Sequence, residues 1–263
     1  MSQENSNFSR WWEFYVVRYG MGSVIGGIIV FFLFSSNSYL QPMLFTAWGK
    51  FPYRKIDGAL LTLLAGYGLA YCYFASAPIL VLHAGRFVFQ TGDKNKTLKL
   101  LWGVIIFIVL NVFWYSLSRI FDQKIDEYWW VAFMLLDFLL TCQICILYAI
   151  ILNRKNLFHF YKKLANQRAH SDKGGLVESY RHLREHGNSF LILLLEIVLA
   201  LILYFVSISN AFNKNQLLVL LYYVAIVILW IAPSIFIWFT AVELEIEFVG
   251  DNANEHESGN TGS

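Results

Sequence analysis

Six apolar runs along the chain are each long enough to cross the hydrocarbon core of a bilayer, which takes about 20 residues of helix. Within lipid every backbone hydrogen bond must be made inside the protein, so uninterrupted runs of this length predict helices. Only 14% of the residues are charged, whereas a soluble domain carries about 25%, and the excess apolar surface must face lipid. We therefore predict an all-α, polytopic membrane helical bundle. Its spans are 15–34, 58–82, 98–117, 129–152, 190–208 and 217–239.

The polar segments around these spans divide the chain into five parts. The first part is a cytosolic or interfacial amino-terminal segment. The last is an acidic tail that we expect to be largely disordered, because its final stretch DNANEHESGNTGS has no apolar residue beyond Ala253. A basic connection, expected to be a cytosolic helical hairpin, separates spans four and five. The parts are 1–14, spans one to four at 15–152, the hairpin at 153–188, spans five and six at 189–242, and the tail at 243–263.

The distribution of Lys and Arg predicts the orientation, because short cytosolic loops retain positive charge. With the amino terminus inside, fourteen of the twenty basic residues lie on the inner side and six on the outer side. We therefore expect both termini in the cytoplasm. The six outer residues are Lys50, Arg54, Lys55, Arg119, Lys124 and Lys214.

The connection at 153–188 has two amphipathic halves. Leu157, Phe160, Tyr161 and Leu164 share one face of the first half at helical spacing, and the second half has a similar face. The stretch SDKGG between them has the composition of a turn. We expect spans four and five to continue as two paired helices that project about 20 to 25 Å beyond the membrane.

The second half of this connection contains RHLREHG, residues 181–187, which spells the His-x-x-Glu-His zinc site of one class of metallopeptidases. His182 and His186 share a helical face, and Glu185 lies beside them as a general base would. Against a metal site, the motif lies in a charged stretch, and Gly187 is expected to interrupt the helix. We favour a solvated helix face over a zinc site, and we predict no cofactor.

Polar residues within the spans are candidates for function, since a charge near the bilayer centre costs about 2.5 to 3.5 kcal/mol. Depth matching predicts that Arg18 pairs with Glu196, and it also allows Asp137 to meet Asn111. These groups act either as internal ties between helices or as the lining of a cation path. The candidate residues for a pore or ion path are Asn111, Asp137, Thr141, Glu196 and Ser207.

Small residues at a spacing of four predict close helix packing. Gly22 and Gly26 show this spacing in the first span, and Gly66 and Ala70 show it in the second. The pattern suits packing within one chain and equally suits a seam between copies in a homo-oligomer.

Proline at 78 is expected to bend the second span, and Pro233 the sixth. His83 and Arg86 then lie where the second span reaches the cytosol. Together with the basic residues of the hairpin they are candidates for sensing an anionic, nucleotide-type ligand. The candidate ligand-sensing residues are His83, Arg86, Arg168, Lys173, Arg181 and Arg184.

The chain resembles small membrane effectors of bacterial antiphage defence in its layout, a multi-pass body with a basic cytosolic sensor. The resemblance extends to the stretches RYGMGSVIGGIIVFF and ASAPILVLHAGRF. That resemblance implies a homo-oligomer in the bacterial inner membrane that opens an ion-conducting pore when a nucleotide-type signal is made. It also implies that the nucleotide-type signal binds near four basic residues of the hairpin, Arg168, Lys173, Arg181 and Arg184.

Two classes of function therefore remain after the sequence is read. One is a homo-oligomeric ion channel or pore gated from the cytosol, with lipid and a cytosolic anionic ligand as partners and no stable nucleic-acid partner. The alternative is a small secondary transporter, or a metal-dependent membrane enzyme that uses His182, Glu185 and His186. The ion or substrate is not predicted.

Overall fold

The computed structural model describes residues 2–45, 58–86, 96–120, 125–171, 176–209 and 215–260. Side chains are described for 19–44, 58–86, 101–120, 125–154, 156–164, 187–209 and 215–247. Within the described ranges the chain is helical and contains no strand, which confirms the predicted all-α bundle. The helices are α1 (Ser2–Ser36), α2 (Gln41–Phe45), α3 (Gly58–Ser76), α4 (Pro78–Ala84), α6 (Lys96–Ile120), α7 (Glu127–Leu152), α8 (Arg154–Ser171), α9 (Leu176–Ile208) and α10 (Gln216–Asn260).

Six stretches of these described helices are long and apolar enough to cross a membrane, so the chain is a multi-pass membrane protein. Each stretch lies within a few residues of a predicted span except at the carboxyl side of the last, which reaches Glu247. The stretches are Tyr19–Ser36, Gly58–Ala84, Leu101–Ile120, Glu127–Leu152, Gly187–Ile208 and Gln216–Glu247.

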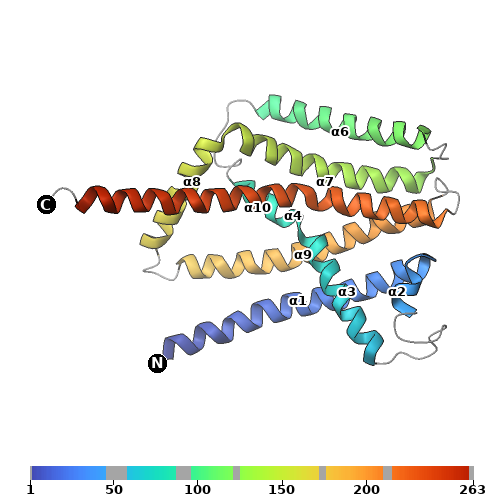
Figure 1. Cartoon of the computed structure of the whole chain (residues 1–263), viewed down its shortest axis with the longest axis horizontal. Coiled ribbons are helices and arrows are strands. Elements are labelled where there is room, and N and C mark those ends of the chain that lie inside the picture. Colours follow the sequence, from blue (N-terminus) through green and yellow to red (C-terminus); the bar gives the residue numbers. More distant parts are fainter. Residues whose placement is uncertain are drawn as a thin grey trace.

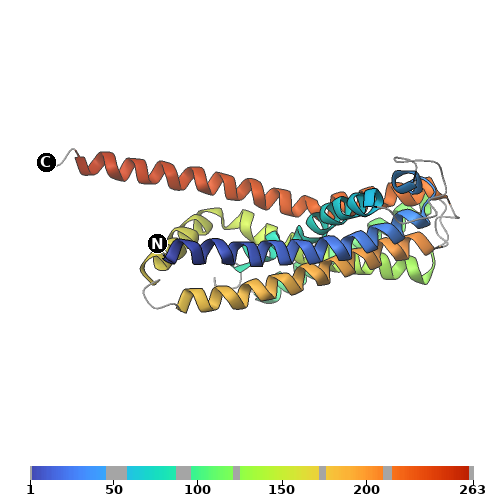
Figure 2. The ribbon, with the colours of Figure 1, turned by 90° about the horizontal axis from the view of Figure 1, so that it is seen from below.

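Both chain termini lie at the same end of the elongated bundle, hereafter the terminal end (Figure 1). Helix α10 extends well beyond the other helices at this end (Figure 2). Its 45 residues correspond to about 65 to 70 Å at 1.5 Å per residue. The tail was expected to be largely disordered, but α10 continues through it as far as Asn260.

The main core lies between α1, α3, α6, α7, α9 and α10. At the end opposite the terminal end, the rings of Trp114, Trp129, Phe133 and Tyr222 pack together, with centroids 4.3 Å apart for Trp114 and Phe133. Stacked and tilted aromatic rings are packed favourably at such distances. These contacts hold α6, α7 and α10 to one another.

Polar side chains fix the helix ends at that opposite end. Asp126 precedes α7 in an extended conformation and accepts a 2.9 Å hydrogen bond from the Trp129 backbone N–H, which is a helix amino-terminal cap. The Ser209 hydroxyl donates a 2.7 Å hydrogen bond to the same carboxyl, which joins the start of α7 to the end of α9. These bonds set the register between the two spans.

The two helices expected between spans four and five are present, but they do not form a straight projecting stalk. A turn at Asn153 separates α7 from α8, and α8 runs across the terminal end of the bundle (Figure 1). Leu157 of α8 is buried against Val81, Ile150 and Ile237 of α4, α7 and α10. The apolar face of α8 therefore packs on the bundle, where residues of three spans meet it.

Candidate functional site

Glu196 lies near the centre of the fifth span and is fully buried, with 0% of its surface exposed, where α9 meets α1 and α3. A Cβ built on Gly22 of α1 would lie 2.9 Å from Glu196 Oε1 and 2.5 Å from Cys72 Sγ of α3, so carboxyl and thiol share this junction. The Tyr71 hydroxyl donates a 2.8 Å hydrogen bond to the Glu196 backbone carbonyl. Among the described residues, only the Cys72 thiol, a weak donor, is placed to hydrogen-bond the carboxyl oxygens.

A carboxyl group buried in this way is chemically suited to take up a cation or a proton. An unpaired polar group in an apolar interior costs several kcal/mol, so a positive partner beside it is strongly favoured. The neighbouring Gly22 has no side chain and Cys72 a short one, which leaves the carboxyl surrounded by small groups. We name Glu196, Gly22, Tyr71 and Cys72 the Glu196 junction.

The predicted Arg18–Glu196 pair lies outside the described side chains, because none is described before Tyr19. Arg18 precedes Gly22 by four residues in α1, and residues four apart in a helix share a face. Gly22 adjoins Glu196, so this face of α1 is directed toward the carboxyl. The Arg18–Glu196 pair stays a prediction.

Asp137 of α7 is also fully buried, but it has a partner. The indole N–H of Trp114 in α6 donates a 2.8 Å hydrogen bond to Asp137 Oδ1. The contact of Asp137 with Asn111 that depth matching allows is not formed: the Asn111 amide donates at 2.9 Å to the Phe107 carbonyl of its own helix. An indole one turn of helix beyond the asparagine reaches the carboxyl, because its longer side chain spans the gap between α6 and α7.

The other polar candidates are divided between two seams. Thr141 is half-buried and faces Gly103 on α6, as does Cys145. Ser207 is half-buried on α9 and faces Tyr223 of α10. The five predicted pore residues therefore lie along the α6–α7 seam, in the Glu196 junction and along the α9–α10 seam, and do not form one row.

Small residues bring the backbones of α1 and α3 into contact, although not at every predicted position. Gly22 and Gly26 of α1 face α3, so of the two open alternatives they serve packing within the chain. In α3, Gly66 and Ala70 are exposed and a Cβ on Gly66 would meet nothing within 4 Å, so they do not pack against α1, and a seam between copies stays a prediction. Gly68 is the buried contact instead, and a Cβ there would overlap the Ser23 carbonyl and the Gly27 backbone.

The second span breaks at Ala77, as the proline at position 78 predicts. Pro78 has no N–H to continue the ladder of α3, so α3 ends at Ser76 and α4 begins at Pro78. Two side chains of α10 bind the carbonyls at this break: Trp230 Nε1 donates to Ala75 at 3.1 Å, and the Ser234 hydroxyl donates to Ala77 at 2.7 Å. Helix α10 itself continues through Pro233 without a break.

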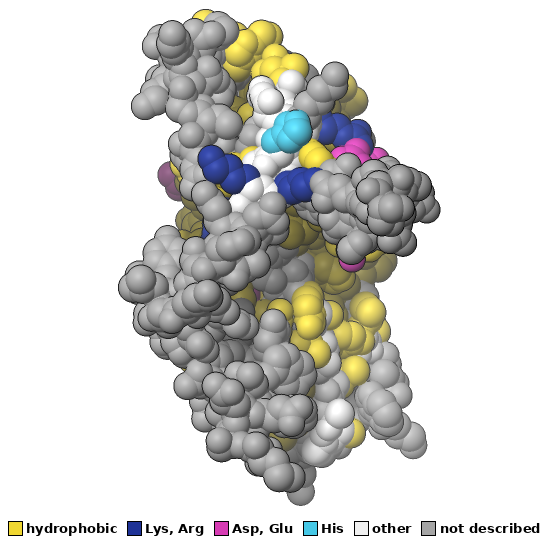
Figure 3. Space-filling model, turned by 90° about the vertical axis from the view of Figure 1, so that its left-hand side faces the viewer, with side chains coloured by type: hydrophobic (Ala, Val, Ile, Leu, Met, Phe, Trp, Pro, Cys, Tyr) yellow, Lys and Arg dark blue, Asp and Glu magenta, His cyan; other side chains and the backbone are white. Residues whose placement is uncertain are grey.

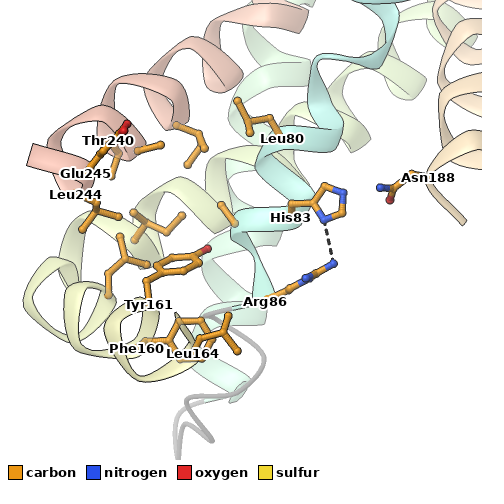
Figure 4. A pocket seen from close by; sticks show the side chains of 15 residues that line it. Leu80, His83, Arg86, Phe160, Tyr161, Leu164, Asn188, Thr240, Leu244 and Glu245 are labelled. Atoms are coloured by element: carbon orange, nitrogen blue, oxygen red, sulfur yellow. Dashed lines mark hydrogen bonds between the residues drawn. The ribbon is translucent and has the colours of Figure 1, made fainter. Parts of the chain in front are cut away.

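The break directs α4 toward the terminal end, where His83 and Arg86 lie at its carboxyl end. Arg86 Nη2 is 3.1 Å from His83 Nδ1, and a guanidinium has only donors, so the imidazole nitrogen accepts (Figure 4). Asn188 of α9 lies across from His83 in the same view. A cavity of about 620 Å³ lined by α4, α7, α8 and α10 opens beside these side chains.

Basic side chains gather on the terminal end (Figure 3). Arg154 forms a 2.7 Å ion pair with Glu243 of α10, and both side chains are more than half exposed. The remaining predicted sensing residues, Arg168, Lys173, Arg181 and Arg184, lie outside the described side chains. The described basic side chains here are Arg86, Arg154, Lys162 and Lys163.

The zinc motif lies on α9, which runs from Leu176 to Ile208 without interruption, so the expectation that Gly187 interrupts the helix is wrong. The side chains of His182, Glu185 and His186 are outside the described set. Among the described residues no group of three or more His, Cys, Asp or Glu side chains could hold a metal ion.

No model of a protein family matches the chain, and neither the curated proteins nor the solved structures contain a match to it.

Four structural contacts were not predicted from the sequence: those made by Gly68, Cys72, Trp114 and the pair Trp230 and Ser234. One signal was present, because Trp230 is a tryptophan in the middle of a span, whereas most tryptophans of membrane proteins lie at the interfaces. An indole inside a span needs an acceptor for its N–H, and the Ala75 carbonyl beside the proline break is one.

Proposed function

We propose that the chain is a subunit of a cation-conducting channel whose path passes Glu196 and which is gated from the terminal end. The observation that carries the proposal is the Glu196 junction, in which a fully buried carboxyl has only the weakly donating Cys72 thiol as a hydrogen-bond partner among the described residues. Retaining an acid in a span is costly, and acids that line ion paths are the usual reason for doing so. Asp137 has its indole partner and is proposed as a tie between α6 and α7.

The break at Ala77 supports a gate. Tyr71 and Cys72 of the Glu196 junction lie in the last turns of α3, directly before the break. Beyond it, α4 carries His83 and Arg86 to the terminal end. A ligand or partner that shifts α4 about Ala77 would change the packing of Cys72 against Glu196, and broken helices commonly serve as hinges in such transitions.

The positive-inside distribution of Lys and Arg supports a cytosolic terminal end, and therefore a gate that responds to the cytosol. Cross-linking of the protein in vesicles reports whether the channel is the homo-oligomer that the sequence predicts.

Ion flux from liposomes tests the proposal. Purified protein is reconstituted, and K⁺ and Na⁺ efflux are compared with Cl⁻ efflux for the wild type and for Glu196→Gln. The amide keeps the shape of the side chain but removes the charge, so we expect cation flux to fall about tenfold, which corresponds to about 1.4 kcal/mol of lost attraction for the ion. Arg18→Gln is expected to raise cation flux, since it removes the charge that the predicted pair supplies.

Glu247→Gln is the matched control, because Glu247 is an exposed acid near the end of the last span. It should leave the flux unchanged. Cation flux that is equal in wild type and in folded, inserted Glu196→Gln would overturn the role of Glu196. No flux from wild type in any condition would overturn the channel itself.

A further inference from the structure

Two apolar cavities meet at one polar point on the terminal end of the bundle. The first, about 620 Å³, lies between α4, α8 and α10 and is lined by Leu157, Phe160 and Leu244. The second, about 790 Å³, lies between α1, α3, α9 and α10 and is lined by Tyr73, Ile192 and Trp238. Leu80, His83 and Asn188 line both cavities. We name the first the α8 wing and the second the α1 wing.

The shared point has the chemistry of an anion site. Arg86 donates one N–H to His83 Nδ1 and keeps further guanidinium donors for another acceptor. Because His83 Nδ1 accepts, the proton of a neutral imidazole is on Nε2, which makes that nitrogen a donor as well. In Figure 4 the His83 ring points toward Asn188, whose amide adds a third donor group on the α9 side.

The depth of this point matches the boundary between acyl chains and headgroups. The second span ends at Ala84 and the fifth begins at Gly187, so His83, Arg86 and Asn188 lie within two residues of a span end. Tyr73 and Trp238, which line the α1 wing, are 53% and 56% exposed and both lie within membrane-spanning stretches. The α1 wing is therefore accessible from lipid.

We propose that this paired cleft binds one anionic phospholipid, with its phosphate at Arg86, His83 and Asn188 and one acyl chain in each wing. A molecule with one negative head and two apolar chains matches a cationic point between two mostly apolar cavities, in which the one described carboxylate, Glu245, lies on the α10 side away from Arg86 (Figure 4). A soluble anion would leave both wings without an occupant, which disfavours it. The proposal does not depend on ion conduction.

Native mass spectrometry tests this directly. Protein reconstituted in equal amounts of dioleoylphosphatidylglycerol and dioleoylphosphatidylcholine is released into detergent, and the bound lipid of each kind is counted. Wild type is expected to retain phosphatidylglycerol preferentially. Arg86→Gln should lower the ratio of bound phosphatidylglycerol to phosphatidylcholine about tenfold, because a charge-assisted hydrogen bond to the phosphate is lost.

Lys163→Gln is the matched charge control, since Lys163 is exposed on α8 and lines neither wing. It should retain the wild-type ratio. Ala241→Trp tests whether an acyl chain occupies the α8 wing. Ala241 lines this wing, and an indole there fills space that an acyl chain needs. We expect it to reduce the retention of both lipids, while its thermal unfolding in detergent shows that the fold persists.

Competition with inorganic phosphate at millimolar concentration distinguishes a lipid-binding site from a site for a soluble anion. Retention of phosphatidylglycerol in its presence supports the lipid site. Displacement of the lipid by phosphate alone would overturn it in favour of a soluble anion. An equal loss of preference in Arg86→Gln and Lys163→Gln would also overturn it, because it would show a general surface attraction.

Discussion

At the scale of single residues, Gly68 decides how α1 and α3 pack. The backbone of α1 at Ser23 and Gly27 occupies the space that a Cβ on Gly68 would need, and Ser23 donates a 2.7 Å hydrogen bond from its hydroxyl to the Ala65 carbonyl. Two helices approach this closely only where side chains are absent or very small. Because Gly22 lies on the same face of α1, this contact also sets the distance between α1 and Glu196.

A substitution at Gly68 tests this packing. Gly68→Ala should lower the free energy of unfolding by about 1 to 3 kcal/mol, because one helix must shift to admit the methyl group. Thermal unfolding in detergent measures the change. Gly66→Ala is the control: it lies half a turn away, meets nothing within 4 Å, and should be neutral or stabilising by up to about 1 kcal/mol from helix propensity. Equal effects of the two changes would contradict the packing.

At the scale of elements, the second span is two helices held in one orientation by α10. Pro78 has no N–H for the Phe74 carbonyl four residues earlier. Trp230 and Ser234, which lie four residues apart on α10, donate to the nearby carbonyls of Ala75 and Ala77. Side chains of a neighbouring helix commonly stabilise the backbone around a proline within a membrane in this way. The angle of α4, and with it the place of His83 and Arg86, thus depends on contacts that α10 makes.

Ser234→Ala tests whether α10 holds α4 in place. It removes one hydrogen bond worth about 1 kcal/mol, so local opening of α4 should become about fivefold more frequent. Hydrogen exchange of a peptide that covers Pro78–Ala84 reports this opening.

The control for Ser234→Ala is Thr240→Ala on the same helix. The Thr240 hydroxyl bonds only within α10, to the Phe236 carbonyl at 3.0 Å, so its loss should leave the exchange of α4 unchanged. If Ser234→Ala also leaves α4 exchange unchanged, the hydrogen bond at Ala77 does not restrain the hinge.

At the scale of the whole molecule, the two ends of the bundle differ in character. The terminal end carries α8, a group of basic side chains and the protruding part of α10 (Figures 1 and 3). The capped start of α7 and the cluster of aromatic rings lie at the opposite end. The amphipathic α8 follows its span after a single turn residue and lies across the bundle, as interfacial helices do. Its basic outer side is suited to an anionic leaflet.

Cysteine labelling tests the predicted orientation. A cysteine introduced at Lys163, which is exposed on α8, should react with a membrane-impermeant maleimide only when the cytosolic face is open to the reagent. A cysteine at Lys124 should react from outside in intact cells. The native Cys72, Cys142 and Cys145 lie within spans, beyond the reach of a charged reagent. Labelling of both sites from the same side would contradict the topology.

The positions of the six spans followed from the sequence alone, because the cost of exposing backbone to lipid makes a long apolar run helical whatever its neighbours are. Local chemistry likewise predicted the break before Pro78 and the close contact of Gly22 and Gly26 with another helix. These features depend on a residue and its chain neighbours. Pairing with a particular side chain is different, since it depends on how each helix is rotated about its axis.

That rotation was decided by the tertiary structure. Gly66 and Gly68 both suit close packing by type, yet only Gly68 faces α1, because a helix turns about 100° per residue and neighbours two apart point to different sides. Depth in the membrane matched Asp137 to Asn111, but side-chain length and rotation brought Trp114 to it instead. The apolar face of α8 was evident from its spacing, while its docking on Val81, Ile150 and Ile237 required three spans to end together.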